Sequence, residues 1–559
     1  MKQIGEKKSS FCFWVLLFIY TAIALFRLGA YEIPETAWNS TEKGKEIILD
    51  FGDVRSISGF VYFLGNYENR KFSIETVSDR TGKWEHVGNI QMSQVYQWGI
   101  ERMNLQTRYL KFKTENRYTQ LNELIFFDRA GQIVRPVNLL EYPELFDEEG
   151  LYISGASFQS GTVFDEPVFA RTAYEYLNGI RSYEDTHPPM GKILISVGIL
   201  LFGMNPFGWR FMGVLSGSAM LIVVWLFGRK LFKNPWISFL ITAIFAFDFL
   251  HFTHSRLAQV DSFLVLFMML MNYFMFLYGE LLLTGQITRK ENGGKRLLGY
   301  LLGSGICMGL AISCKWSGFY GAAGLALIWL FYTGSAVRKG YLKINELFKI
   351  VGWCVVSFII VPMVIYTVSY IPYISIDPTR SYFEELILNQ INMFRYHSQL
   401  KTVHPQSSEW YQWPLAAGIM TYISTYTRTA EQHVLLLGNP VFWFSGLAAV
   451  FVCIYETWNR KDRKGAILLV MYLLPMIPWM LVPRTSFLYH YFPSLPALAL
   501  MLGYWAEHAG KKGLILLGIV SLLSIVMFII FYPVLAGIEI SFEHFMKLQW
   551  LPWWDFMSV

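Results

Sequence analysis

Apolar residues along this chain form long blocks separated by short polar loops, instead of lying scattered as in a soluble core. A helix needs about 20 mostly apolar residues to cross the hydrocarbon layer of a membrane, and the blocks have about this length. The pattern therefore predicts a polytopic α-helical membrane protein with about eleven transmembrane helices. Their expected positions are 11–29, 208–228, 236–254, 261–283, 297–313, 317–334, 349–371, 438–457, 465–483, 492–508 and 513–533.

One shorter apolar stretch, Ile193–Phe202, does not fit this series of spans. It is too short to cross a bilayer, and it follows His187-Pro188-Pro189, where two prolines end any preceding helix. A full span here would place the basic loop at Arg229 opposite the other basic loops. We therefore expect an interfacial or re-entrant segment on the outer face.

Lysine and arginine gather in alternate loops between the apolar blocks. If the N-terminus is cytoplasmic, every cytoplasmic loop is basic, as the positive-inside rule requires. These loops contain Arg229, Lys230, Lys233, Arg289, Lys290, Lys295, Arg296, Arg338, Lys339, Lys343, Arg460, Lys461, Arg463, Lys464, Lys511 and Lys512. We expect a multi-pass protein of the cell membrane with a cytoplasmic N-terminus. The C-terminus and two long loops, 30–207 and 372–437, then lie outside.

Residues 46–134 contain short runs rich in β-branched and aromatic residues in place of membrane-length blocks. In Phe72–Glu75 and Leu110–Lys113 apolar residues alternate with polar ones, as in half-buried strands. Several such runs predict an extracytoplasmic β-sandwich over residues 31–135. This region resembles discoidin-type, galactose-binding-like sandwiches. A carbohydrate ligand and a purely structural role are both open expectations, because a fold alone does not define function.

The amino-acid composition agrees with a membrane protein and restricts the classes of binding partner to be expected. Hydrophobic residues make up 54% of the 559 residues and charged residues only 16%, against about 25% in soluble domains. The net charge of +6 lies mostly in short loops, where it sets orientation, so we expect the lipid bilayer and no nucleic acid as a partner. The five cysteines lie in or beside apolar blocks and offer neither a disulfide framework nor zinc spacing. We predict no metal and no cofactor.

These observations divide the chain into six parts. They are a first transmembrane helix (1–30), the β-sandwich (31–135), a first outer loop with interfacial helices (136–207), transmembrane helices two to seven (208–371), a second outer loop (372–437) and transmembrane helices eight to eleven (438–559).

Nearly all reactive groups lie in the parts expected outside. Asp165 and Glu166 stand at the start of a helix-like stretch. Neighbouring helical positions do not share a face, so the two acids are not expected to act as a glycosidase-like pair. One acid can point into a site while the other fixes local structure. The alternative is that both simply favour a helix N-terminus.

Cationic and histidine side chains near the outer membrane surface are candidates for binding a lipid phosphate. His187 and Lys192 flank the two prolines, although a lysine here can also reach lipid headgroups. Charge at membrane depth is costly and therefore often functional, and arginine can donate two hydrogen bonds to a phosphate. The ionisable residues at outer ends of spans are Arg210, Asp248, His251, His254, Arg256, Asp261, Lys315 and Arg484.

The second outer loop and the segment before the tenth span combine amides, aromatic rings and histidines, as sugar sites do. Equally, tyrosine and tryptophan belong to the aromatic belt of any membrane protein. The candidates for donor or acceptor contacts are Asn392, Arg395, His397, His404, Tyr489 and His490.

From about residue 160 to the end, ordered motifs make the chain similar to the protein O-mannosyltransferases, of the GT-C class of polyprenyl-phosphate-sugar-dependent enzymes. These motifs are Phe164-Asp165-Glu166, the HPPxGK run ending at Lys192, Asn392-Met393-Phe394, Tyr396-His397, His404-Pro405, Ser407-Ser408, Trp413-Pro414, Gly438-Asn439-Pro440, Val482-Pro483-Arg484 and Tyr489–Pro493. Each motif alone is weak, but their common order and spacing make a joint signal.

The resemblance implies mannose transfer, with inversion, from polyprenyl-phosphate-mannose to Ser/Thr hydroxyls of secreted or surface proteins. It implies that Asp165 and Glu166 match the family's catalytic acidic pair, with Asp165 as the base, and that Arg210 lies near the lipid phosphate. The β-sandwich and the short second outer loop depart from fungal and animal members and favour a prokaryotic one. A GT-C enzyme that moves another sugar, or uses a lipid or cell-wall acceptor, is the nearest alternative. A secondary transporter is disfavoured, because the chain shows no internal repeat.

Overall fold

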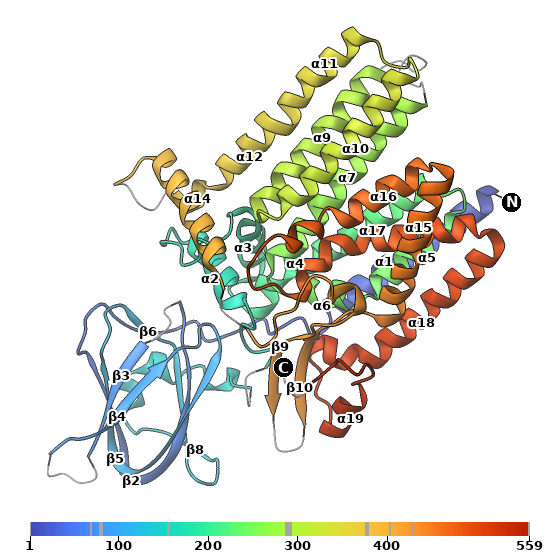
Figure 1. Cartoon of the computed structure of the whole chain (residues 1–559). Coiled ribbons are helices and arrows are strands. Elements are labelled where there is room, and N and C mark those ends of the chain that lie inside the picture. The colour runs from blue at the N-terminus through green and yellow to red at the C-terminus, as the bar shows by residue number, and fades with distance from the viewer. Residues whose placement is uncertain are drawn as a thin grey trace.

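The computed structural model describes residues 2–66, 70–77, 82–153, 157–284, 293–374, 379–401, 404–426 and 430–556. Figure 1 shows a bundle of long helices with a β domain attached near one end of it. We call this the β-domain end of the bundle. The first outer loop and most of the second gather there, so the parts of the chain that carry the candidate residues lie together.

The bundle contains a helix at each of the eleven expected spans. The helices are α1 (Lys2–Leu25), α4 (Pro206–Leu231), α5 (Pro235–Ala246), α6 (Phe249–Ser255), α7 (Val260–Leu283), α9 (Gly293–Cys314), α10 (Gly318–Arg338), α11 (Ile344–Val355), α12 (Val361–Ser369), α15 (Pro440–Arg460), α16 (Arg463–Leu473), α17 (Leu495–His508) and α18 (Gly510–Ala536). The third expected span corresponds to the pair α5–α6, and the seventh to α11 and α12.

Among the described residues, eight helices are long and apolar enough to cross a membrane, or nine if the bent pair α5–α6, with its angle of 61°, is one span. The chain is therefore a multi-pass membrane protein. Helices α16 and α17 have 11 and 14 residues and are short for a bilayer, so the total of eleven stays a prediction. Arg289 and Lys290, expected in a cytoplasmic loop, lie outside the described residues.

Three helices begin at the same local signal, an asparagine followed by proline. Asn205, Asn234 and Asn439 precede the prolines that open α4, α5 and α15, and each side chain accepts a backbone N–H of the first turn. Proline suits the first helical position, where no N–H partner is needed, and asparagine satisfies one of the unpaired donors. These starts are therefore encoded locally.

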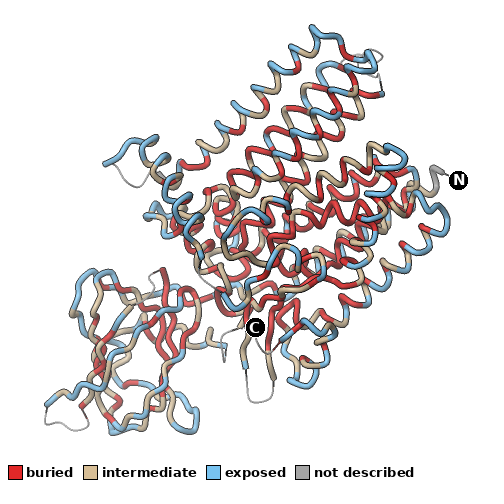
Figure 2. Tube along the Cα trace, viewed as in Figure 1, coloured by how far each residue is buried: buried red, intermediate tan, exposed pale blue. Residues whose placement is uncertain are grey.

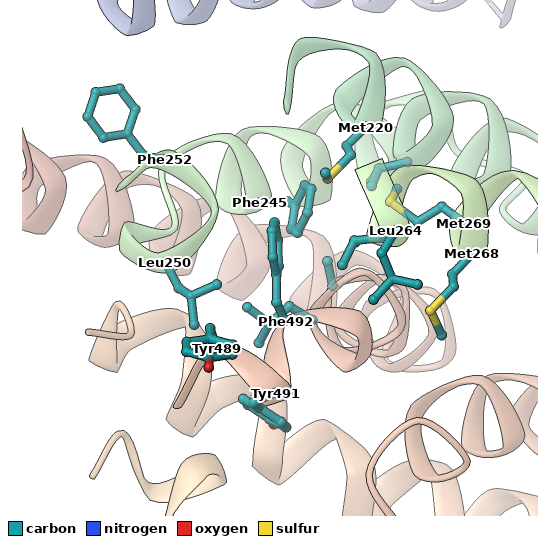
Figure 3. Packing of buried hydrophobic residues seen from close by; sticks show 14 of the residues in the cluster. Met220, Phe245, Leu250, Phe252, Leu264, Met268, Met269, Tyr489, Tyr491 and Phe492 are labelled. Carbon is teal, nitrogen blue, oxygen red and sulfur yellow. The ribbon is translucent and has the colours of Figure 1, made fainter. Parts of the chain in front are cut away.

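The interior of the bundle is apolar and tightly packed. Figure 3 shows Met220, Phe245, Leu264, Met268 and Phe492 in the same region of the interior, and α4, α5, α7 and the 3-10 helix η7 (Leu488–Ser494) share one core. In α4 and in α7, 67% of the most apolar 18-residue stretch is buried inside the protein, whereas in the α11–α12 span only 17% is buried. Figure 2 shows the same contrast along the traces. We expect the outer helices to present their apolar side chains to lipid.

Shorter elements cap the β-domain end. They are α2 (Glu166–Leu177), α3 (Met190–Phe202), α14 (Tyr382–Gln399), the hairpin β9 (Met420–Tyr426) and β10 (Glu431–Leu436), and α19 (Phe542–Lys547). Helix α3 covers the stretch expected to be interfacial or re-entrant. With 13 residues it is too short to span, and its depth in the membrane stays a prediction.

The β domain forms where the alternating runs predict strands. It contains β1 (Trp38–Ser40), β2 (Glu46–Phe63), β3 (Arg70–Val77), β4 (Glu85–Met92), β5 (Trp98–Thr114), β6 (Thr119–Leu121), β7 (Glu123–Phe127) and β8 (Ile133–Val134). Six strands make an antiparallel sheet in the order β4-β3-β5-β2-β7-β8, and β1 pairs with β6. The sheet is observed, whereas the discoidin-like sandwich stays a prediction.

The long strand β2 connects the β domain to the bundle. Its register with β5 shifts between Asp50 and Arg55 and again between Ile57 and Gly59. Leu49 and Phe60, on either side of these irregularities, both enter the domain's own core. Val61 and Phe63 belong to the core of the bundle. The β domain is thus packed against the membrane part of the chain.

Candidate active site

A cavity of about 320 Å³ opens at the β-domain end of the bundle. It lies between the turn before α3, the link from α9 to α10, helix α14 and the segment before η7. Its lining residues are Thr186, His187, Pro188, Lys315, Trp316, Ser317, Tyr320, Phe394, His397, Ser398, Trp479, Leu481, Val482, Pro483 and Arg484. Two are cations, and most others are aromatic or aliphatic. This lining suits a ligand with both an anionic group and apolar surface.

The first cation, Lys315, directly follows α9 and is fixed by Asp261 in the first turn of α7. Its Nζ donates to both carboxylate oxygens of Asp261, at 2.9 and 3.0 Å. It also lies 5.0 Å from the centre of the Tyr489 ring. An ammonium group has three protons, and these two bonds leave one for a ligand in the cavity.

The second cation, Arg484, is oriented by His397 of α14. The Nε2–H of His397 donates to the Thr186 carbonyl at 2.7 Å, so its Nδ1 accepts from Arg484 Nη1 at 2.6 Å. Burial, and then the proximity of His187 and Arg484, lower the pKa of His397 to about 3. A neutral imidazole in this tautomer holds the guanidinium at the cavity wall.

Asp165 immediately precedes α2, and its side chain makes no capping hydrogen bond to that helix. The preceding Phe164 has φ of +51°, a conformation that a bulky residue rarely adopts, and its ring lies 4.5 Å from that of Tyr422. The pKa of Asp165 is raised to about 7, mainly by burial; the positive charge of Lys315 opposes this rise, and the negative charges of Asp261 and Glu184 add to it. The Asp165 carboxylate therefore makes no capping hydrogen bond to α2, and its pKa lies close to neutral pH, as a general base requires.

Glu166 and Arg210 form a fully buried pair away from the cavity lining. Arg210 donates Nε–H and one Nη2–H to Glu166 at 2.8 and 2.7 Å. Its other N–H groups bond the carbonyls of Leu28, Phe158 and Gly161. All five donors are thus used. In this structure no N–H donor of Arg210 is left for the phosphate contact that the resemblance implies.

Lys192 is also buried and does not reach the cavity. Its Nζ donates to Glu184 and, at 2.7 Å, to the carbonyl of His187. Burial alone would raise the pKa of Glu184, but Lys192 and His187 hold it well below its ordinary value. The pair fixes the proline turn that carries His187 into the cavity wall. His187 itself has a pKa lowered by burial.

The remaining sequence candidates are divided between the cavity and its surroundings. His397 and Arg484 meet there, and Tyr489 and His490 lie behind the wall, with the His490 ring 3.8 Å from that of Trp479. Three other candidates are exposed and line none of the cavity: Asn392, Arg395 and His404.

Sequence reasoning identified Asp261 and Lys315 as ionisable residues at span ends, but it did not pair them, because 54 residues separate them. It missed Tyr422, Trp316 and Trp479. Tyr422 donates to or accepts from His254 Nδ1 at 2.8 Å and packs on Phe164. Aromatic residues are common throughout this chain, so nothing local distinguishes these three.

Family models match two adjoining parts of the chain. Residues 200–377 match dolichyl-phosphate-mannose-protein mannosyltransferase, and residues 382–554 match the C-terminal four-transmembrane region of protein O-mannosyltransferase. The chain is 27% identical over 466 residues to a polyprenol-phosphate-mannose–protein mannosyltransferase of Mycolicibacterium smegmatis, covering 72% of this chain and 89% of the relative. A relative of the same name from Mycobacterium tuberculosis is 26% identical over 475 residues, covering 72% and 88%.

The fold is also that of a solved structure, the Saccharomyces cerevisiae protein O-mannosyltransferase Pmt1-Pmt2 complex bound to the sugar donor. The TM-score is 0.62 at 15% identity, and the match covers 71% of this chain and 90% of that one. The fold is therefore that of a GT-C-like polytopic membrane protein. Within that class, the family models and relatives show that the chain belongs to the protein O-mannosyltransferase family.

Proposed function

We propose that this protein transfers mannose from polyprenyl-phosphate-mannose to serine or threonine hydroxyls of proteins. The family and the names of its relatives indicate the donor and the class of acceptor. The observation that carries the mechanism is a carboxylate of raised pKa, Asp165, within electrostatic range of Lys315. Asp165 is not itself a lining residue, whereas Lys315 lines the cavity together with the second fixed cation, Arg484.

In this mechanism Asp165 accepts the proton of the acceptor hydroxyl as its oxygen attacks the anomeric carbon. The bond between that carbon and the phosphate oxygen breaks, and its electron pair leaves with the polyprenyl phosphate. Lys315 and Arg484 stabilise the developing negative charge on the phosphate. A single displacement inverts the anomeric centre. Asp261 and His397 act as positioning residues for the two cations, and the Glu166–Arg210 pair positions the loop that carries Asp165.

An apolar groove beside the cavity supports a lipid-linked donor. It has a volume of about 430 Å³, lies along α9 and α12, and shares Trp316 with the cavity. A further apolar pocket of about 240 Å³ shares Met308 and Phe358 with the groove. An isoprenoid chain in this groove would place its phosphate beside Lys315.

We also propose that the active site faces the outside of the cell membrane, with the N-terminus in the cytoplasm and eleven spans between the termini. The basic loops support this orientation, because they alternate consistently along the sequence. The donor sugar and the secreted acceptor would then meet on the same side.

The proposal is tested with membranes that contain the full chain, radiolabelled polyprenyl-phosphate-mannose and Ser/Thr-containing peptides. We expect labelled peptide, with a loss of about 100-fold or more in rate for Asp165→Asn. Glu144→Gln, a half-buried acid of the same loop outside the site, is the matched control and keeps its rate. Label in lipid or glycan with none in peptide would overturn the acceptor, and transfer only from another polyprenyl-phosphate sugar would overturn the donor.

A further inference from the structure

Three carboxylates converge at an edge of the β domain, apart from the active-site cavity. Glu123 begins β7, and Asp147 and Glu148 lie in the chain that follows the sheet. One oxygen of each lies within 4.8 Å of the other two. Among the described residues, no ion pair joins any of the three to a lysine, arginine or histidine, and the neighbouring Arg135 pairs with Glu149 instead. Like charges this close repel unless something neutralises them.

Glu123 provides a second and separate observation. Its side chain is completely buried, with Oε2 accepting the backbone N–H of Glu148 at 3.1 Å. Its Oε1 is buried and has no hydrogen-bond partner. Buried polar atoms are nearly always partnered, so an orphaned carboxylate oxygen indicates a ligand that completes it. The adjacent Asn122 also has a buried side-chain oxygen without a partner.

The surroundings of the cluster are preorganised by the chain. Glu148 accepts the backbone N–H groups of Glu35, at 3.1 and 2.9 Å, and Thr36, at 3.1 Å. The Thr36 hydroxyl donates to Asp147 at 2.9 Å. Asn122 donates to the Pro34 carbonyl at 3.2 Å. Hence the chain entering the β domain and the chain leaving it meet at this point.

We propose that Glu123, Asp147 and Glu148 bind a calcium ion that joins the two ends of the β domain, although the sequence alone predicts no metal. The donor atoms are all oxygens, which hard cations prefer, and the group includes no histidine or cysteine of the kind that zinc sites use. Calcium tolerates irregular geometry and additional water ligands, whereas magnesium requires a near-ideal octahedron. Asp147 is exposed, which leaves one side open for water.

The ion has a structural role in this proposal, which does not depend on the proposed transferase function. It would hold residues 34–36 against 147–148, just before the loop that leads to Asp165. The rival explanation is a proton on Glu123 in place of a metal. Burial, together with Asp147, Glu148 and Glu149, raises the pKa of Glu123 to about 8, so a protonated carboxyl is the alternative that the experiment has to exclude.

The test uses the purified full chain in detergent after chelator treatment, with calcium alone as the probe. We expect one equivalent of ⁴⁵Ca²⁺ in equilibrium dialysis, with Kd of about 10⁻⁴–10⁻³ M, the range of extracellular sites. We also expect a higher Tm with calcium and sensitised luminescence when Tb³⁺ replaces it. Glu123→Gln should abolish saturable binding, whereas Glu144→Gln should leave it unchanged.

Asp147→Asn keeps the test decisive if Glu123→Gln does not fold. This exposed position tolerates the change, and loss of one charged ligand should weaken calcium binding on the order of 10-fold. Three results would overturn the proposal. They are no saturable binding up to about 10 mM calcium, well above that range; equal binding by Asp147→Asn and the wild type; and a Tm that responds to the protonation of Glu123 but not to calcium.

Discussion

Asp165 is held among apolar and acidic neighbours that favour its protonated form. Because a general base must be ionised, we predict that kcat/KM for mannosyl transfer rises with pH and levels off above the pKa of Asp165, about 7. Below that pH the rate should fall about tenfold per unit, as the ionised fraction does. The measurement is a pH–rate profile with saturating peptide. A profile flat from pH 5 to 8 would contradict Asp165 as the base.

The same environment makes ionised Asp165 destabilising. Its pKa is 3.8 when unfolded and about 7 when folded, so between these values the folded protein binds more protons. Stability contributed by this group is therefore lost as pH rises through that window. We predict that inactive Asp165→Asn has a higher Tm than the wild type at pH 8 and an equal Tm near pH 3.5. Equal thermal unfolding curves at both pH values would count against this account.

Arg210 shows how a buried ion pair can occupy a side chain whose type and position suggest ligand binding. An arginine at a span end suggested a phosphate ligand, but all its donors serve Glu166 and three carbonyls. We predict that Arg210→Met destabilises the protein by about 3–5 kcal/mol, because Glu166 is left charged and buried. The readout is the Tm and folded yield in detergent. An unchanged Tm with a raised donor KM would instead restore the phosphate role.

At the scale of elements, the α9–α12 groove leads to a prediction about the donor. Met308 on α9 lines both the groove and the apolar pocket beyond it. Met308→Trp should block the passage between them and raise KM for a long polyprenyl donor about tenfold or more, if a few buried methylenes are displaced at about 0.8 kcal/mol each. A short-chain isoprenyl-phosphate-mannose should react as before.

The control for this prediction lies on the same helix. Ile306 is 38% exposed and lines neither the groove nor the pocket beyond it, so Ile306→Trp adds the same bulk outside the groove. It should leave KM unchanged for both donors. If the two variants affect the long donor equally, the chain does not lie in this groove.

Elements were predictable where their signals are local. Spans follow from the length of apolar blocks, and three helix starts follow from Asn-Pro pairs. Strand β2 shows the limit of this reasoning. In the sequence, polar residues separate the apolar runs Ile47–Phe51 and Ile57–Leu64, yet in the structure one strand crosses them. Irregularities at Asp50–Arg55 allow this, and they depend on pairing with β5, which sequence periodicity does not reveal.

At the scale of the whole molecule, the site consists of contacts between distant segments. Asp165 was predicted through family motifs, but the role of Lys315 depends on Asp261, and that of Arg484 on His397, 87 residues earlier. Such pairs arise only when the bundle packs. The sequence could therefore predict which end of the molecule carries the chemistry, while the partner of each charge required the three-dimensional structure.

Orientation in the membrane is the property of the whole molecule that sequence predicts and the fold alone does not decide. The basic loops place Lys511 in the cytoplasm and the loop with Glu144 outside. In a cysteine-free background, we predict that Glu144→Cys reacts with a membrane-impermeant maleimide in intact cells, because the catalytic side faces outward. Lys511→Cys, exposed at the opposite end, should react only after permeabilisation. The reverse pattern would place the active site in the cytoplasm, where secreted proteins could not be its acceptors.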